Sequence, residues 1–157
     1  MKKIFENIFS TDINKEPFNY IHKKNFVELN EYDKLYENMH YLNAIIWSQW
    51  RKTHELYNEK LLFDVQDFNP DYKCVALWFF TDRGERKLTS KKDIEIYSTT
   101  KNASRIITRE PNSFLFFELN DEQRIRISPP EETRVLRPCI QFDFSVDVFR
   151  ELLNKYA

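Results

Sequence analysis

Glycine is almost missing from this chain, which has only Gly84 among its 157 residues. Dinucleotide-binding turns and P-loops each need several glycines, because the backbone must approach phosphate groups closely. One glycine cannot supply either motif. The sequence therefore excludes a standard Rossmann or P-loop nucleotide site.

Cysteine and histidine are also scarce, with two and three residues. Cys74 and Cys139 lie in apolar, strand-like runs, where a reduced thiol behaves as a small buried hydrophobe, so no disulfide is expected. His40 and His54 would lie about 21 Å apart on one helix, too far to share a metal ion. We expect neither a metal site nor a cofactor.

No recognisable catalytic residue can be assigned from motifs. Nucleophile elbows and Cys-x-x-Cys pairs are absent from the sequence. Asp71 and Glu85 match the letters of a nuclease PD…(D/E)-x-K pattern. A hairpin about Gly84 would place these two carboxylates roughly 25–30 Å apart, so they could not share an ion. We expect a protein that is not an enzyme.

Long apolar runs are missing as well. No run approaches the roughly 18 residues of a membrane span. The first residues, 1–7, include charged and polar side chains too early for a signal peptide. We expect a cytoplasmic protein without a membrane partner.

Large side chains are abundant. Aromatic residues make up 16% of the chain and charged residues 31%. This composition and length suit one folded domain spanning 1–157, with an aromatic core and a charged surface.

The strongest periodic pattern follows a lead-in at 1–29. Apolar residues recur at spacings of three and four, which predicts one long amphipathic helix within 30–66, ending before Asn69-Pro70. The repeating positions are Tyr32, Leu35, Tyr36, Met39, Leu42, Ile45, Ile46, Trp50, Leu56, Tyr57 and Leu61.

The segment 71–144 changes to short apolar runs separated by turn residues, which predicts a mostly antiparallel sheet of about five or six strands. A turn at 81–84 predicts a hairpin after the first strand, and Asn120-Asp121 predicts another. Ser145 is a good N-cap for a C-terminal helix at 145–157. The predicted strands are 72–80, 93–98, 104–108, 114–119, 123–128 and 139–144. The sequence thus predicts an α+β fold.

Charge is segregated along the chain. Nine acidic residues stand against four basic ones in 25–71, whereas eight basic residues stand against three acidic ones in 83–109. This segregation either forms faces that meet a charged partner or is an ordinary solvated surface. Nucleic-acid binding is one alternative function, because arginines that can contact phosphates continue beyond this stretch. The candidate basic patch is Arg105, Arg109, Arg124, Arg126, Arg134 and Arg137.

A second alternative function comes from a local resemblance. About a quarter of the chain resembles the phosphate-binding stretch of FMN-binding split barrels related to pyridoxamine 5′-phosphate oxidase. The resemblance implies a flavin-dependent oxidoreductase whose FMN phosphate contacts Ser98, Thr99, Ser104 and Arg105. By topology alone, 72–156 also resembles a pleckstrin-homology-like domain. The residues that carry the flavin resemblance are Ile94-Glu95-Ile96-Tyr97-Ser98-Thr99, Ser104-Arg105, Glu110-Pro111 and 114–127.

Protein binding is the function that the sequence favours. The predicted long helix carries more large apolar residues than one core-facing stripe needs, and aromatic residues are common interface anchors. The candidate partner-binding residues are Tyr41, Trp47, Trp50 and Tyr57. Alternatively, the lead-in or a terminal helix covers them.

The composition, rich in Lys, Asn, Ile, Phe and Tyr, indicates an AT-rich genome. We therefore expect a small non-catalytic accessory protein of a bacterium or phage that binds another protein or itself. An immunity protein, a defence inhibitor or a secretion-system component would fit this description.

Overall fold

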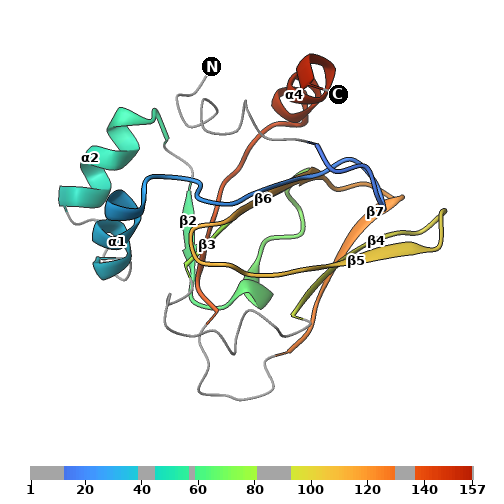
Figure 1. Cartoon of the computed structure of the whole chain (residues 1–157), viewed down its shortest axis with the longest axis horizontal. Coiled ribbons are helices and arrows are strands. Elements are labelled where there is room, and N and C mark those ends of the chain that lie inside the picture. The colour runs from blue at the N-terminus through green and yellow to red at the C-terminus, as the bar shows by residue number, and fades with distance from the viewer. Residues whose placement is uncertain (1–12, 39–44, 57–58, 81–92, 130–136, 157) are drawn as a thin grey trace.

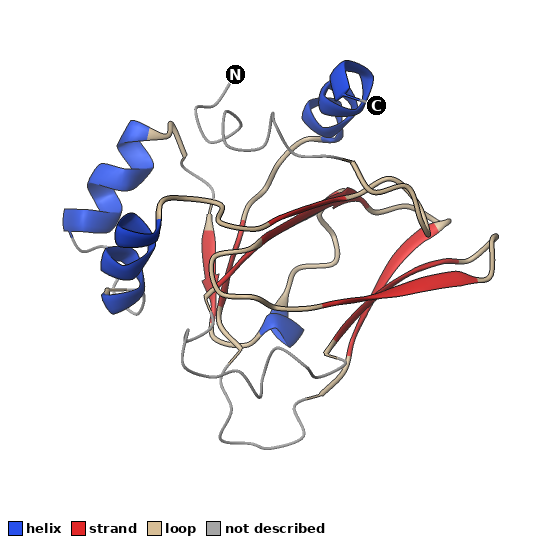
Figure 2. Ribbon diagram, viewed as in Figure 1, coloured by secondary structure: helices blue, strands red, loops and turns tan. Residues whose placement is uncertain are grey.

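The computed structural model of this chain describes residues 13–38, 45–56, 59–80, 93–129 and 137–156 (Figure 1). Within these ranges it contains three α-helices, one short 3-10 helix and two antiparallel sheets, so the predicted α+β class is confirmed. The α-helices lie at the periphery, and the strands cross the middle of the molecule (Figure 2).

The larger sheet has five strands. Its spatial order is β1 (Ile21–Lys23), β6 (Phe114–Glu118), β3 (Cys74–Phe79), β8 (Cys139–Gln141) and β2 (Lys60–Leu62). All six residues of β3 are buried, as expected for an apolar strand in the middle of a covered sheet. The sequence prediction that 114–117 forms a central strand is confirmed.

The smaller sheet has three strands, in the order β5 (Ala103–Ile107), β4 (Ile94–Ser98) and β7 (Gln123–Ile127). Its strands alternate between the two faces. Ile94 and Ile96 of β4 are buried in the core, whereas the exposed residues of β7 lie on the other face. In β4 and β7 the sheet therefore has one face turned to the core and one face turned to solvent, whereas Arg105 of the edge strand β5 is exposed on the core-facing side.

The helical part differs from the single long helix predicted at 30–66, and that prediction was wrong. Two nine-residue helices, α1 (Leu29–Glu37) and α2 (Ile45–Thr53), lie beside one another (Figure 1). They are followed by β2 and by η2 (Val65–Asp67). The apolar spacing is satisfied within each helix separately, and folding back lets both apolar stripes reach the same core.

The end of α2 has a clear backbone cause. Glu55 has a positive φ of 58°, which a continuing right-handed helix cannot accommodate. The Leu56 N–H donates to Arg51 O at 2.9 Å, and the Glu55 N–H donates to Lys52 O at 3.3 Å. This pattern is a Schellman motif, with Leu56 buried after the turn.

The third α-helix is α4 (Val146–Tyr156), which confirms the predicted C-terminal helix. The Ser145 hydroxyl accepts a hydrogen bond from the Val148 N–H at 3.4 Å, so the predicted N-cap is present. Phe149 and Leu152 are buried in the core. No helix in the described ranges combines the length and the apolar character that crossing a membrane requires.

The helices pack on one face of the larger sheet. Trp78 and Phe114 are cross-strand partners and therefore share a face with Phe116. The Trp78 ring lies 5.1 Å from the ring of Trp50 on α2, and the Phe116 ring lies 5.0 Å from that of Phe149 on α4. These aromatic contacts fix the helices against the sheet.

A buried ion cluster joins the two sheets. Arg137, before β8, donates to the Asp64 carboxylate, after β2, at 2.6 and 3.1 Å. Arg109, after β5, donates to Asp93, before β4, at 2.6 Å. The two pairs meet at Arg137, whose Nη1 lies 3.6 Å from the Asp93 carboxylate and donates to Ser128 O at 2.7 Å. Two arginines and two aspartates thus neutralise one another between the sheets.

Several predicted strand details need correction. The strands at 74–79, 94–98, 103–107, 114–118, 123–127 and 139–141 match predicted runs, but they belong to two sheets. The predicted hairpin pairings were wrong, because β3 pairs with β6 and β8, and β7 pairs with β4. Gly84 lies outside the described residues. The short strands β1 and β2 were missed.

Both cysteines are free and buried, as predicted. Cys139 lies opposite Phe79, at the end of β3 away from Cys74. Burial raises the pKa of the Cys74 thiol to about 12. A thiol in this environment stays protonated at neutral pH and is a poor nucleophile.

The ion cluster gives a stability prediction. Asp93→Asn keeps the shape of the side chain but leaves Arg109 and Arg137 short of one buried counter-charge. We expect a loss of about 3–5 kcal/mol in the free energy of unfolding, measured by urea denaturation followed by tryptophan fluorescence. The control is Glu95→Gln, which removes the carboxylate of the half-exposed pair with Arg126 and should cost less than about 1 kcal/mol. Equal losses in the two variants would contradict the role of the cluster.

Candidate protein-binding groove

An open groove of about 410 Å³ runs between α1 and α2. Two short helices that pack side by side leave such a groove where their side chains diverge. It is lined by Glu28, Asn30, Glu31, Lys34, Leu35, Ile46, Gln49, Trp50, Thr53 and His54. Residues from both helices therefore face one shared space.

The floor of the groove is apolar and firmly held. Leu35 and Trp50 belong to the hydrophobic core, and Ile46 packs against it. The centroid of the Trp50 ring lies 5.1 Å from that of Trp78 and 4.5 Å from that of His54. The His54 Nδ1 donates to Trp50 O at 2.8 Å, because a carbonyl oxygen can only accept. These contacts fix the shape of the floor.

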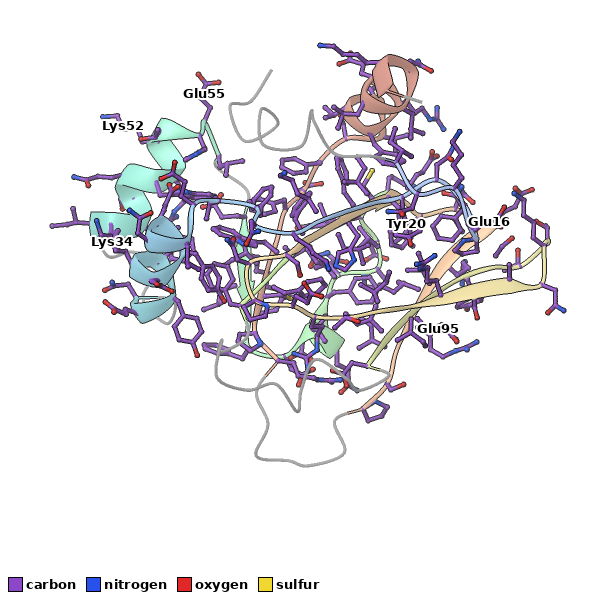
Figure 3. The ribbon with its side chains drawn as sticks, in the orientation of Figure 1. Glu16, Tyr20, Lys34, Lys52, Glu55 and Glu95 are labelled. Atoms are coloured by element: carbon purple, nitrogen blue, oxygen red, sulfur yellow. The ribbon has the colours of Figure 1, made fainter. Side chains whose placement is uncertain are left out.

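The rim of the groove is polar and charged. Glu28 and Glu31 stand at the start of α1, and Lys34 follows one turn later. Lys34, Lys52 and Glu55 extend into solvent at this end of the molecule, far from Glu95 on the smaller sheet (Figure 3). An apolar floor within a charged rim is the arrangement found in protein-binding surfaces.

Two indole N–H groups near the groove have no acceptor among the described residues. The Nε1 atoms of Trp47 and Trp50 are buried there without a hydrogen-bond partner, whereas Nε1 of Trp78 donates to Asn112 Oδ1 at 3.1 Å. Each unsatisfied buried donor costs about 1–3 kcal/mol. The contacts of Trp47 and Trp50 in the core are therefore apolar.

Two of the four predicted partner-binding residues belong to the core. Trp47 and Trp50 are 0% and 5% exposed, while Tyr41 and Tyr57 lie outside the described residues. The large apolar side chains that do reach solvent from the described parts of these helices are Leu29 and Ile45. Of the two described tryptophans, Trp50 lines the groove and Trp47 does not.

The predicted basic patch is dispersed. Arg109 and Arg137 are 2% and 1% exposed and belong to the ion cluster. Arg105 lies opposite Ile96, and Arg124 lies opposite Tyr97, so they are on different faces of the smaller sheet. Arg134 lies outside the described residues. The described arginines thus do not form one surface of the kind that follows a nucleic-acid backbone.

Two arginines do share the solvent-facing side of the smaller sheet. Arg124 and Arg126 lie opposite Tyr97 and Glu95. The Arg126 guanidinium lies 4.6 Å from the centroid of the Tyr97 ring and donates to Glu95 Oε1 at 2.5 Å. These contacts hold Arg126 flat on the sheet and offset its charge.

Side chains that carry the flavin resemblance stabilise the turn between β4 and β5. Ser98 Oγ accepts hydrogen bonds from the N–H groups of Thr100 and Lys101, at 3.3 and 3.1 Å. Thr99 Oγ1 donates to the carbonyl of residue 121 at 2.9 Å. Ser104 and Arg105 are consecutive residues of β5 and point to opposite faces. The four side chains therefore do not converge on one phosphate position.

The chain was also compared with known proteins. Neither the protein-family models nor the curated proteins contain a match to this sequence. Within the described residues, no group of three or more His, Cys, Asp or Glu side chains could hold a metal ion.

The sequence did not single out most of the groove. Ile46 and Leu35 were predicted as part of one helical stripe, and the rim residues Glu28 and Glu31 were noted only for their charge. The available signal was Asn38, whose side-chain amide donates to Lys34 O at 3.0 Å. Asparagine is favoured at helix C-termini, so it marks the end of α1.

The buried His22 predicts how the stability of the fold depends on pH. Burial lowers the pKa of His22, with Glu110 opposing this shift and Lys24 and Arg105 adding to it. The unfolded chain binds this proton more readily, so stability should fall as the pH drops below the ordinary histidine pKa of about 6.5. The fall ends once the pH is below the folded-state pKa.

The test compares urea midpoints at several pH values for the wild type and His22→Gln. The variant cannot take up the proton, so its stability should decline less between neutral and mildly acidic pH. Parallel declines in the two proteins would show that His22 is not responsible.

Proposed function

We propose that this chain is a non-catalytic accessory protein that binds another protein by holding a segment of it in the α1–α2 groove. The observation that carries this proposal is the groove itself, with Leu35, Ile46 and Trp50 on its floor and charged side chains on its rim. A segment of a partner would cover apolar surface there while its polar groups stay at the edge.

The groove is suited to binding because its walls are already in place. The α2 wall is anchored to β3 by the contact between Trp50 and Trp78. The α1 wall is anchored by Leu35 and Tyr32, which are both buried, and the Tyr32 ring lies 5.1 Å from that of Phe80. A preformed groove costs little ordering entropy when a partner binds.

The amino-acid composition supports the bacterial or phage origin that this proposal assumes. Abundant Lys, Asn, Ile, Phe and Tyr, with a single glycine, are consistent with an AT-rich bacterial or phage genome. Immunity proteins, defence inhibitors and secretion-system components of such genomes are small proteins that act by binding. We place this chain among them as part of the proposal.

The decisive variant is Gln49→Arg, with Ser48→Arg as its matched control. Both positions are exposed neighbours on α2, but only Gln49 lines the groove. A large cation at residue 49 would fill the groove without disturbing the core. The same change at residue 48 would add the same charge outside it.

The measurement is affinity capture from host lysate with mass spectrometry, using each protein after circular dichroism has shown it to be folded. We expect a partner present in stoichiometric amount with the wild type and Ser48→Arg, and at least tenfold less with Gln49→Arg, a loss of about 1.4 kcal/mol. A partner retained equally by both variants, or the absence of any partner, would refute the groove as the binding site.

A further inference from the structure

We infer that the groove selects a partner segment in which an apolar side chain is adjacent to a lysine or arginine. This inference rests on the proposed function and specifies the chemistry of the partner. The apolar side chain would cover the floor made by Leu35, Ile46 and Trp50. The cation would lie at the rim, beside the two carboxylates of α1.

The walls of the groove carry more negative than positive charge. Glu28 and Glu31 both line the groove, against one lysine, Lys34. Arg51 does not offset them, because its Nε lies 2.9 Å from Glu59 Oε1. Lys52 extends into solvent and does not line the groove. An acidic segment would therefore be repelled by the carboxylates, whereas a basic one would be attracted.

The position of Lys34 indicates which end of the groove takes the cation. Lys34 lies one turn after Glu31 and lines the same groove. It repels a cation near it, so the favourable place is the start of α1. Thr53 and His54, at the end of α2, also line the groove, and the carbonyl end of a helix attracts positive charge. The rim therefore orients the segment.

The probe is a phage-displayed library of short random peptides, selected on the folded full-length protein and counter-selected on Gln49→Arg. We expect the groove-dependent peptides to share an apolar residue with Lys or Arg next to it. One selected peptide is then synthesised, and its affinity is measured for the wild type, for Glu28→Gln/Glu31→Gln and for the control Glu37→Gln. Glu37 is an exposed residue of α1 that does not line the groove.

Glu28→Gln/Glu31→Gln should bind this peptide about fivefold to tenfold more weakly than the wild type, and Glu37→Gln should bind it equally well. Groove-dependent peptides without a basic residue, or an equal affinity for all three proteins, would overturn the charge inference and leave the proposed function standing. If no selected peptide depends on Gln49, the proposed function fails as well.

Discussion

The buried cluster of two arginines and two aspartates is the constraint on which the arrangement of the two sheets depends. Asp64 and Arg137 belong to segments next to β2 and β8, whereas Asp93 and Arg109 flank β4 and β5. Apolar contacts between sheets tolerate sliding, but charges in a low-dielectric interior must meet their partners. Each aspartate pairs with an arginine that flanks the same sheet, so the tie between the sheets is Arg137, whose Nη1 lies 3.6 Å from the Asp93 carboxylate and donates to Ser128 O at 2.7 Å.

The helices pack on the face of the larger sheet that carries Trp78 and Phe116. Helix α2 contacts Trp78, α4 contacts Phe116, and α1 contacts Phe80, two residues after Trp78. Asn112 ties the lead-in to this layer, because its side chain accepts from Trp78 Nε1 and exchanges hydrogen bonds with the backbone of Val27. Since Val27 directly precedes the first groove residue, Glu28, the same contacts that build the core also place the acidic end of the groove.

The sequence predicted those parts of the fold in which one local signal decides the structure. Neighbouring residues in the sequence are enough to recognise the alternation of a strand, the apolar run at 114–117 and the Ser145 cap. The break between α1 and α2 was missed because an apolar stripe has the same spacing in one helix as in two. The burial of Arg137 could not be predicted for a related reason, because nothing in the local pattern separates this residue, which pairs with a carboxylate 73 residues away, from Arg124 on the surface.

The groove illustrates how a core and a binding surface can share residues. The aromatic excess of the helices is used inside, where Trp47 and Trp50 contact Trp78, so it cannot also serve as a broad exposed face. The apolar surface that reaches solvent consists of Leu29, Ile45 and a narrow strip of floor between the two helices. A strip of this kind contributes affinity for almost any apolar side chain. Discrimination among partners must therefore come from Glu28, Glu31 and Lys34. The two carboxylates attract a basic side chain of the partner, and the lysine repels it, so one orientation of the bound segment is favoured over the reverse.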